Sequence, residues 1–286
     1  MAVCQVCFRH CDIPEGKTGF CGARVCRSGA VVPGNYGKIT SAALDPIEKK
    51  PLARFYPGSR ILSVGSYGCN LRCPFCQNHE ISWSAEAMEY ARTADRVTPE
   101  EIRDSALYYR KDGNIGVAFT YNEPLIGWEF VRDTAKLVRE AGMVNAMVTN
   151  GTAELSVLEE LLPHIDAMNI DLKGFTDRYY RDVLGGDRKT VMEFIARAVQ
   201  DCHVEITCLI VPGENDSEEE IREMSRWIAG LTDRSGRVIG ENIPLHISRF
   251  FPRFRMTDRN ATDVRTVYRL ADTAGEYLRH VYRGNC

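Results

Sequence analysis

The sequence predicts an α/β protein, a partial (β/α)6 TIM barrel with an N-terminal Cys-rich extension. From residue 61 onward, short apolar runs alternate with amphipathic stretches of helical length, which is typical of a parallel sheet with helical crossovers. Residues 1–60 are instead rich in Cys, Gly and Pro and carry only short β-like pieces. We therefore expect a Cys-rich extension with a candidate metal site over 1–60 and the barrel over 61–286. An open doubly wound sheet is the alternative.

About six β-α units make up the predicted barrel, fewer than the eight of a closed TIM barrel. Two helix starts are marked by capping boxes, in which Thr98 and Ser217 are each followed three residues later by Glu. Gly142 marks a helix end. The expected strands are 61–65, 115–119, 144–149, 167–172, 204–211 and 243–247, and the expected helices are 98–110, 125–141, 154–162, 189–200, 217–227 and 262–278.

Composition and charge narrow the function classes. The chain is 44% hydrophobic and 26% charged, as is usual for a soluble globular protein. Its net charge is -3 and its basic residues are scattered, which disfavours general binding to nucleic acid or to a membrane surface. No stretch stays apolar for about 18 residues, and the first residues lack a secretory pattern. We expect a cytoplasmic protein with no nucleic-acid or membrane partner.

The cysteines are unevenly distributed. Of eleven in the chain, five fall within 4–26 and three within 69–76. Disulfide frameworks are rare in cytosolic proteins, so metal or redox chemistry is the leading explanation.

The stretch 65–82, GSYGCNLRCPFCQNHEIS, places Cys69, Cys73 and Cys76 in the spacing C-x3-C-x2-C. It follows the first predicted strand, at the edge of a parallel sheet where chemistry gathers. A structural zinc site has four protein ligands. A 4Fe-4S cluster also takes four thiolates, so three leave one iron open to another ligand. The alternatives are three ordinary cysteines or a zinc loop completed from elsewhere.

With an aromatic residue, Phe75, before its last Cys, this motif resembles the signature of the radical SAM superfamily. The resemblance implies that Cys69, Cys73 and Cys76 hold a 4Fe-4S cluster whose open iron binds S-adenosylmethionine. It further implies reductive cleavage to methionine and a 5′-deoxyadenosyl radical, which abstracts hydrogen from a substrate. The partial barrel of that superfamily agrees with the β-α units counted above.

Further stretches are similar to one subfamily, the radical SAM enzyme of the AmmeMemoRadiSam system, which is related to pyruvate formate-lyase activating enzymes. This resemblance implies AMMECR-type and Memo-type partners and a flavodoxin- or ferredoxin-type electron donor. The stretches are 45–59, 67–82, 118–124, 148–152, 169–175, 212–216 and 244–252.

The same resemblance implies cofactor contacts. Phe75 would border the adenine, and Asn122 and Glu123 would face the methionine amino group. Asp171 and Lys173, which alternation places on one face of a strand, would reach the ribose hydroxyls and the methionine carboxylate. The alternatives are simple packing for Phe75, a solvated turn for Asn122 and Glu123, and an ion pair at the barrel rim for Asp171 and Lys173.

Three more polar residues have two interpretations each. Asn150 either hydrogen-bonds the cofactor or belongs to an ordinary Asn-Gly turn. His246 lies in an apolar strand, where a lone His is usually a core residue, but the resemblance implies contact with S-adenosylmethionine or substrate. Arg249 either binds a substrate carboxylate or phosphate or is solvated at the rim.

The N-terminal extension carries Cys4, Cys7, Cys11 and Cys21 in the spacing C-x2-C-x3-C-x9-C. Four thiols so close in sequence can saturate a tetrahedral metal ion. Zinc is the preferred occupant and a second iron–sulfur cluster the alternative, with Cys26 able to replace one of the four. A reduced, empty set of thiols is the third interpretation.

Three functions are consistent with these features. The first is a radical SAM enzyme acting on its own unidentified substrate. The second is an activating enzyme for a glycyl-radical enzyme, similar to the pyruvate formate-lyase activases. The third is a non-catalytic metal-binding scaffold, which would not cleave S-adenosylmethionine even with a complete cluster.

Overall fold

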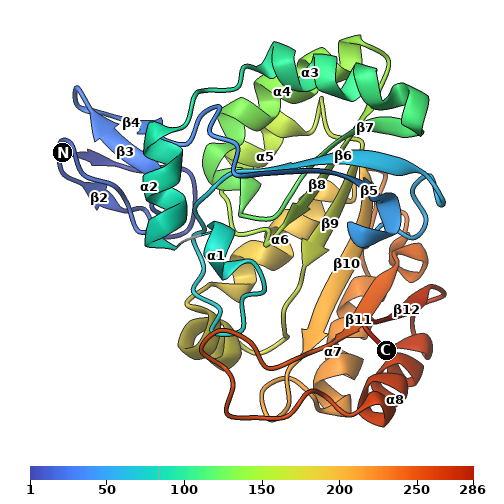
Figure 1. Cartoon of the computed structure of the whole chain (residues 1–286). Coiled ribbons are helices and arrows are strands. Elements are labelled where there is room, and N and C mark those ends of the chain that lie inside the picture. Colours follow the sequence, from blue (N-terminus) through green and yellow to red (C-terminus); the bar gives the residue numbers. More distant parts are fainter. Residues whose placement is uncertain (83) are drawn as a thin grey trace.

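The computed structural model describes residues 1–82 and 84–286, and one eight-stranded sheet forms its centre (Figure 1). The strand order is β12-β11-β10-β9-β8-β7-β6-β5, and no pairing within the described residues joins β5 to β12. Strands β6 to β12 run parallel, and β5 (Ser41–Pro46) runs antiparallel to β6. The parallel strands are β6 (Arg60–Gly65), β7 (Asn114–Phe119), β8 (Val144–Thr149), β9 (Ala167–Asp171), β10 (His203–Ile210), β11 (Leu245–Arg249) and β12 (Val281–Gly284).

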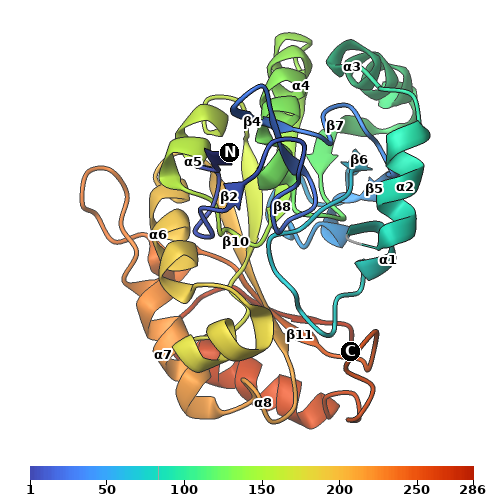
Figure 2. The same ribbon diagram turned by 90° about the vertical axis from the view of Figure 1, so that its left-hand side faces the viewer.

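Helices surround the sheet (Figures 1 and 2). Thr98 and Glu101 form the predicted capping box, and the Ser217 side chain accepts from the backbone N–H of Glu220. Gly142 has a positive φ of 69°. The helices are α1 (His79–Ser82), α2 (Ala85–Thr93), α3 (Pro99–Tyr108), α4 (Trp128–Glu140), α5 (Leu155–Leu161), α6 (Arg188–Ala198), α7 (Glu218–Ala229) and α8 (Val264–Gly275).

The prediction of a partial TIM barrel is confirmed, and the sheet has two more strands than the sequence predicted. Both additional strands lie at the edges, where only one neighbour is available. Strand β5 contains small residues and ends in Pro46, and β12 is only four residues long. Such short edge strands carry little periodic signal of their own. Strand β5 belongs to the sheet although the sequence assigned residues 41–46 to the extension.

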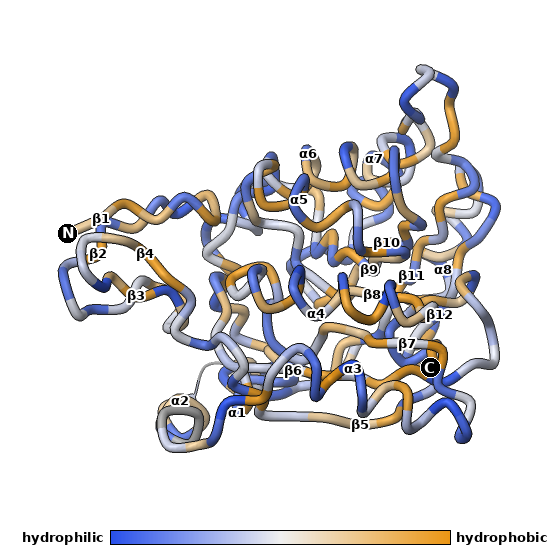
Figure 3. Tube along the Cα trace, turned by 90° about the horizontal axis from the view of Figure 1, so that it is seen from above, coloured by the Kyte–Doolittle hydropathy of each residue, from blue (hydrophilic) through white to orange (hydrophobic). Residues whose placement is uncertain are grey.

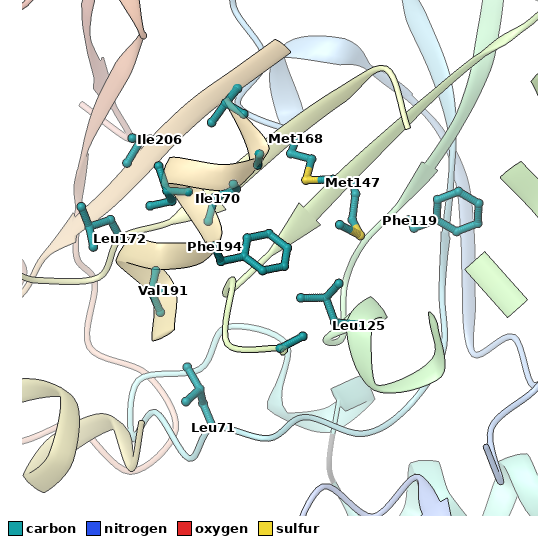
Figure 4. Packing of buried hydrophobic residues seen from close by; sticks show 14 of the residues in the cluster. Leu71, Phe119, Leu125, Met147, Met168, Ile170, Leu172, Val191, Phe194 and Ile206 are labelled. Atoms are coloured by element: carbon teal, nitrogen blue, oxygen red, sulfur yellow. The ribbon is translucent and has the colours of Figure 1, made fainter. Parts of the chain in front are cut away.

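Successive residues of the central strands face opposite sides of the sheet. On the outer side, Ile170 of β9 lies beside Val191 and Phe194 of α6, all of them buried (Figure 4). On the inner side, Asn169 and Thr207 are polar and bond to each other at 2.9 Å. The apolar core therefore lies between sheet and helices, while the upper barrel interior is polar.

The segment between β5 and β6 fills the lower part of the barrel. Ile47 and Leu52 are fully buried and pack against small side chains of the strands, among them Ala118 and Ala146. The backbone carbonyl of Pro51 accepts a hydrogen bond of 2.8 Å from the Asn169 side chain. This plug fills the bottom of the barrel and leaves the opposite end, at the carboxyl ends of the strands, open.

A buried carboxylate joins the plug to the sheet. Glu205 of β10 accepts hydrogen bonds from the backbone N–H groups of Ala53 and Arg54, at 2.9 and 2.7 Å. The Nε2 atoms of His203 and His246 lie 2.9 and 2.7 Å from its oxygens. Burial opposes the charge, but these hydrogen bonds outweigh it and lower the pKa of Glu205 to about 2.

Replacing the carboxylate by an amide, Glu205→Gln, should lower the free energy of unfolding by about 1–3 kcal/mol, because the amide nitrogen would face buried donors. Since the folded-state pKa is depressed, the stability from Glu205 is present above its unfolded pKa of about 4.3 and is lost as pH falls toward 2. Urea denaturation at several pH values measures both effects. The exposed Glu276→Gln is the matched control, and equal midpoints for the two variants would contradict the prediction.

The N-terminal strands form a separate group at one side of the barrel (Figures 1 and 3). Strands β1 (Ala2–Val3) and β2 (Asp12–Ile13) pair antiparallel, as do β3 (Arg24–Arg27) and β4 (Ala30–Pro33). An antiparallel bridge from Cys7 to Ala153 and a contact of 3.2 Å between His10 Nε2 and a Glu154 carboxylate oxygen connect the group to the barrel. None of the described helices is long and apolar enough to cross a membrane.

Candidate functional site

A cavity of about 450 Å³ opens at the carboxyl ends of the strands. This volume is in the usual range for sites that enclose small ligands. Its walls include Thr120 after β7, Asn150 after β8, Asp171 at the end of β9 and Arg249 at the end of β11. Cys69, Cys73 and Cys76 all line it, so the structure brings together three thiols that the sequence predicted as cluster ligands.

The approach of the cysteine loop to the N-terminal group requires glycine at position 68. Gly68 has a φ of 97°, in the left-handed region that side chains disfavour. A Cβ atom there would lie 2.9 Å from both the Ala23 Cβ and the Cys21 carbonyl oxygen. The N–H of Cys69 donates to that same carbonyl at 3.2 Å. The first cysteine of the motif is therefore held directly against the N-terminal group.

Asn122 holds the same loop from the barrel side. Its Oδ1 accepts from the backbone N–H of Ser66 at 2.9 Å, and its Nδ2 donates to the Tyr67 carbonyl at 3.1 Å. The side chain also lines the cavity. Its observed hydrogen bonds thus position the cysteine loop, a role that the sequence analysis did not anticipate.

The thiols of the motif lie in a poorly solvated environment. Burial raises the pKa of Cys69 well above its ordinary value and that of Cys73 to about 11. No fourth cysteine of the described residues lines the cavity, and no group of three or more His, Cys, Asp or Glu there is spaced to hold a single metal ion. Three thiols spread around one cavity fit a cluster with one iron per thiolate and one iron left open.

Glu123 is a buried carboxylate beside the thiols. It accepts hydrogen bonds from the Thr149 hydroxyl at 2.6 Å and from the backbone N–H groups of Asn150 and Leu125 at 2.8 and 3.1 Å. Burial raises its pKa to about 7, although these hydrogen bonds act in the opposite direction. A cationic or N–H donor in the cavity would stabilise its ionised form.

Asn150 links two parts of the site. Its Nδ2 lies 3.0 Å from the Asn70 side-chain oxygen and 3.8 Å from the Cys69 sulfur. Its Oδ1 accepts from the backbone N–H of Thr152 at 3.1 Å. Asn150 thus turns the chain after β8 and lines the cavity, where its hydrogen bond to the cofactor stays a prediction.

Asp171 and Lys173 form an ion pair of 2.7 Å, and both line the cavity. Burial alone would lower the pKa of Lys173, but the Asp171 carboxylate and the nearby Cys73 raise it above its ordinary value. Lys173 therefore stays cationic next to the thiols. A positive charge at this place favours thiolate ligands and anionic groups of a bound molecule.

The remaining predicted residues, Phe75, Arg249 and His246, differ in whether they line the cavity. Phe75 lines the cavity and packs edge-on against Phe250, with ring centroids 6.2 Å apart. Arg249 also lines it, and its Nε donates to the Thr262 carbonyl at 2.7 Å. His246 does not line the cavity. Its Nε2 lies 2.7 Å from a Glu205 oxygen, in the network that joins the plug to the sheet, and its contact with S-adenosylmethionine or substrate stays a prediction.

Sequence reasoning missed part of the cavity wall. Tyr121, Phe250, Phe251 and Arg253 all line it. Tyr121 has an unusual positive φ of 72°, and its hydroxyl donates to Asp45 at 2.9 Å. The aromatic and basic run 249–253, which begins two residues after the end of the predicted strand 243–247, was a usable signal, since residues after strands of a parallel sheet lie at the site edge.

Comparison with known proteins identifies the class. The family described as the Radical SAM superfamily matches residues 63–225, more than half of the chain. The chain therefore belongs to the radical SAM superfamily. An uncharacterized protein of Methanocaldococcus jannaschii is 39% identical over 285 residues, covering 99% of this chain and 80% of the relative. The pyruvate formate-lyase-activating enzyme of Clostridium pasteurianum is 32% identical over 177 residues, covering 61% of this chain and 71% of that enzyme.

Solved structures support the same fold. Streptococcus suis SuiB bound to S-adenosylmethionine aligns with a TM-score of 0.59 and 13% identity, over 79% of this chain and 52% of SuiB. A domain of pyruvate-formate lyase-activating enzyme from Bacteroides vulgatus aligns with a TM-score of 0.50 and 19% identity, over 59% of this chain and 99% of that one. At these identities the likeness establishes the fold alone.

Removing the Asn122 side chain, Asn122→Ala, should loosen the cysteine loop, because the backbone N–H of Ser66 loses its acceptor and the Tyr67 carbonyl keeps only the donor of Asn35. Each buried group left unsatisfied costs about 1–3 kcal/mol, so amide hydrogen exchange over 66–69 should accelerate by roughly tenfold or more. Asn285→Ala is the matched control, since Asn285 also lines the cavity but makes only a 3.5 Å bond to the Arg249 carbonyl. Equal exchange in both variants would show that Asn122 does not hold the loop.

Proposed function

We propose that the chain is a catalytically active radical SAM enzyme in which Cys69, Cys73 and Cys76 ligate a 4Fe-4S cluster with one open iron. When bound, such a cluster supplies the electron that cleaves S-adenosylmethionine to methionine and a 5′-deoxyadenosyl radical. The observation that carries the proposal is the convergence of the three thiols on one cavity with Glu123, Asp171 and Lys173. The radical abstracts hydrogen from a substrate held in the same cavity.

The residues around the thiols suit the parts of S-adenosylmethionine. Glu123 accepts hydrogen bonds from its amino group, since a carboxylate is the strongest acceptor in that wall. Asp171 accepts from the ribose hydroxyls, and Lys173 donates to the methionine carboxylate. Phe75 contributes apolar surface beside the adenine, and Asn150, whose Nδ2 lies 3.8 Å from the Cys69 sulfur, hydrogen-bonds the cofactor. The plug below the cavity keeps the reacting groups away from solvent on that side.

The glycyl-radical activating function is the second candidate, and it is favoured by the pyruvate formate-lyase activating enzymes among the relatives. In that case the substrate is a backbone glycine of a partner protein. The uncharacterized relative from Methanocaldococcus jannaschii, which aligns with 99% of this chain, does not distinguish the two candidates. A non-catalytic scaffold has less support, because a scaffold has no need of an ion pair and a buried carboxylate facing the thiols.

The proposed reaction requires a partner protein that supplies electrons. The cluster needs a low-potential electron donor, and we propose one of the flavodoxin or ferredoxin type. The resemblance to the AmmeMemoRadiSam system extends the proposal to AMMECR-type and Memo-type proteins as functional partners. A cytoplasmic location belongs to the same proposal. So does the division into a Cys-rich N-terminal extension, predicted over 1–60, and a barrel, predicted over 61–286, with β5 and the plug counted to the barrel because they pair with it and fill it.

The triple variant Cys69→Ala, Cys73→Ala and Cys76→Ala tests the function. After anaerobic reconstitution, the wild-type chain should hold about four irons at this motif, and the variant should lose them. Reduced samples with S-adenosylmethionine should form 5′-deoxyadenosine only with the wild-type chain, as measured by liquid chromatography. Cys286→Ser, at an exposed position, is the control and should behave as wild type. A full cluster without 5′-deoxyadenosine would instead support the scaffold.

The variant Glu123→Gln tests the carboxylate. With a pKa near 7, Glu123 is increasingly protonated below neutral pH and loses its acceptor strength. Binding of S-adenosylmethionine to the wild-type chain should therefore tighten as pH rises from 6 to 8, and this dependence should vanish in the variant. The Kd should rise about tenfold at pH 8, as for a charge-assisted hydrogen bond. Isothermal titration calorimetry with Glu276→Gln as control measures both, and parallel pH profiles would refute the assignment.

A further inference from the structure

A second set of thiols lies outside the cofactor cavity. Cys4, Cys7, Cys11 and Cys21 line one small void in the N-terminal group. Three of them are buried and Cys11 is partly buried. The thiols come from separate turns of the chain, which are tied together by the backbone hydrogen bond of 2.9 Å from Cys4 N–H to the Cys11 carbonyl. Four cysteines gathered at one point have no role in the reaction proposed above.

The size of this void distinguishes between the two metal centres that four thiols can hold, a single zinc ion and a 4Fe-4S cluster. Its volume is about 10 Å³, close to that of one water-sized sphere. A four-iron cluster with four sulfides needs far more room, whereas a single ion fits. In the described residues the thiols are not yet spaced to hold an ion. A sulfur in van der Waals contact with a sphere of about 1.4 Å radius lies farther from its centre than the Zn–S distance of about 2.3 Å, so the sulfurs have to move inward for zinc to bind.

Backbone donors point at two of the sulfurs. The N–H of Arg24 lies 3.4 Å from the Cys21 sulfur, and that of Ala23 also donates to it. Cys7 receives a hydrogen bond from the backbone of Arg9. An N–H donor stabilises a thiolate more than a thiol, because the thiolate carries the charge. Burial raises the pKa of Cys7 to about 11 and that of Cys21 above its ordinary value, and these N–H donors offset part of that effect.

The contacts of Cys26, the fifth cysteine of the N-terminal group, exclude it from the set of four thiols around the void. Cys26 is fully buried but does not line the void. Its sulfur lies 3.4 Å from a carboxylate oxygen of Glu15, which also accepts from the backbone of Ser28 and Gly29. Cys26 thus packs in the same group without joining the four thiols.

We propose that Cys4, Cys7, Cys11 and Cys21 form a tetrahedral four-thiolate zinc site that is independent of the radical SAM cluster. Four protein ligands close such a site, so its role is structural. It fixes the turns that carry Cys7 and Cys21, and the carbonyl of Cys21 accepts from the N–H of Cys69. The zinc site therefore supports the back of the cysteine loop.

Metal analysis of the full-length protein tests this proposal. The wild-type chain, purified without oxygen and reconstituted, should contain about one zinc per chain by mass spectrometry, as a four-cysteine site holds one ion. The variant with Cys69, Cys73 and Cys76 changed to Ala should keep that zinc while losing its iron. The double variant Cys4→Ser and Cys7→Ser should lose the zinc. Cys26→Ser is the matched control and should retain it.

A second measurement tests the proposal if the double variant Cys4→Ser and Cys7→Ser does not fold. Cys11→Ser removes the least buried ligand, and its zinc should pass to a chelator at least tenfold faster than wild-type zinc. Replacing zinc by Co²⁺ in the wild-type chain should give the intense visible absorption of a tetrahedral thiolate site. Absence of zinc from the wild type, zinc loss unchanged in Cys11→Ser, or about four irons remaining in the triple alanine variant would each overturn the proposal.

Discussion

Parallel alignment of seven strands is the constraint on which the rest of the molecule depends. Because every connection returns to the same end of the sheet, the residues that follow each strand meet at one edge. Cys69, Glu123 and Asn150 follow different strands and still line one cavity. The strand topology, rather than any single contact, thus brings the residues of the site together.

The opposite end of the barrel is closed by polar chemistry as well as by apolar packing. Ile47 and Leu52 pack against small alanines of the strands. Glu205 accepts hydrogen bonds from backbone N–H groups of the plug. An apolar plug alone would leave those N–H groups buried without acceptors. The carboxylate accepts these N–H groups and is itself bonded by two histidines, which explains ionisable residues deep in the barrel that do not line the cavity.

The N-terminal group and the cysteine loop depend on each other. Gly68 allows the loop to approach Ala23, and the Cys21 carbonyl accepts from the first ligand of the motif. Phe20 is also stacked between the guanidinium groups of Arg9 and Arg72, which come from the two sides of this contact. Residues before the barrel therefore shape the site although they lie outside the family signature.

The sequence by itself determined the αβ alternation, the capped helices and the three thiols, because each depends on spacing within one short stretch of chain. It also predicted that Asp171 and Lys173 share a face, since strand alternation is local. Only the tertiary structure decided that His246 faces Glu205, that Asn122 holds the cysteine loop, and that β5 and β12 complete the sheet. The partners in these contacts are far apart in sequence, and no local pattern specifies which distant groups meet.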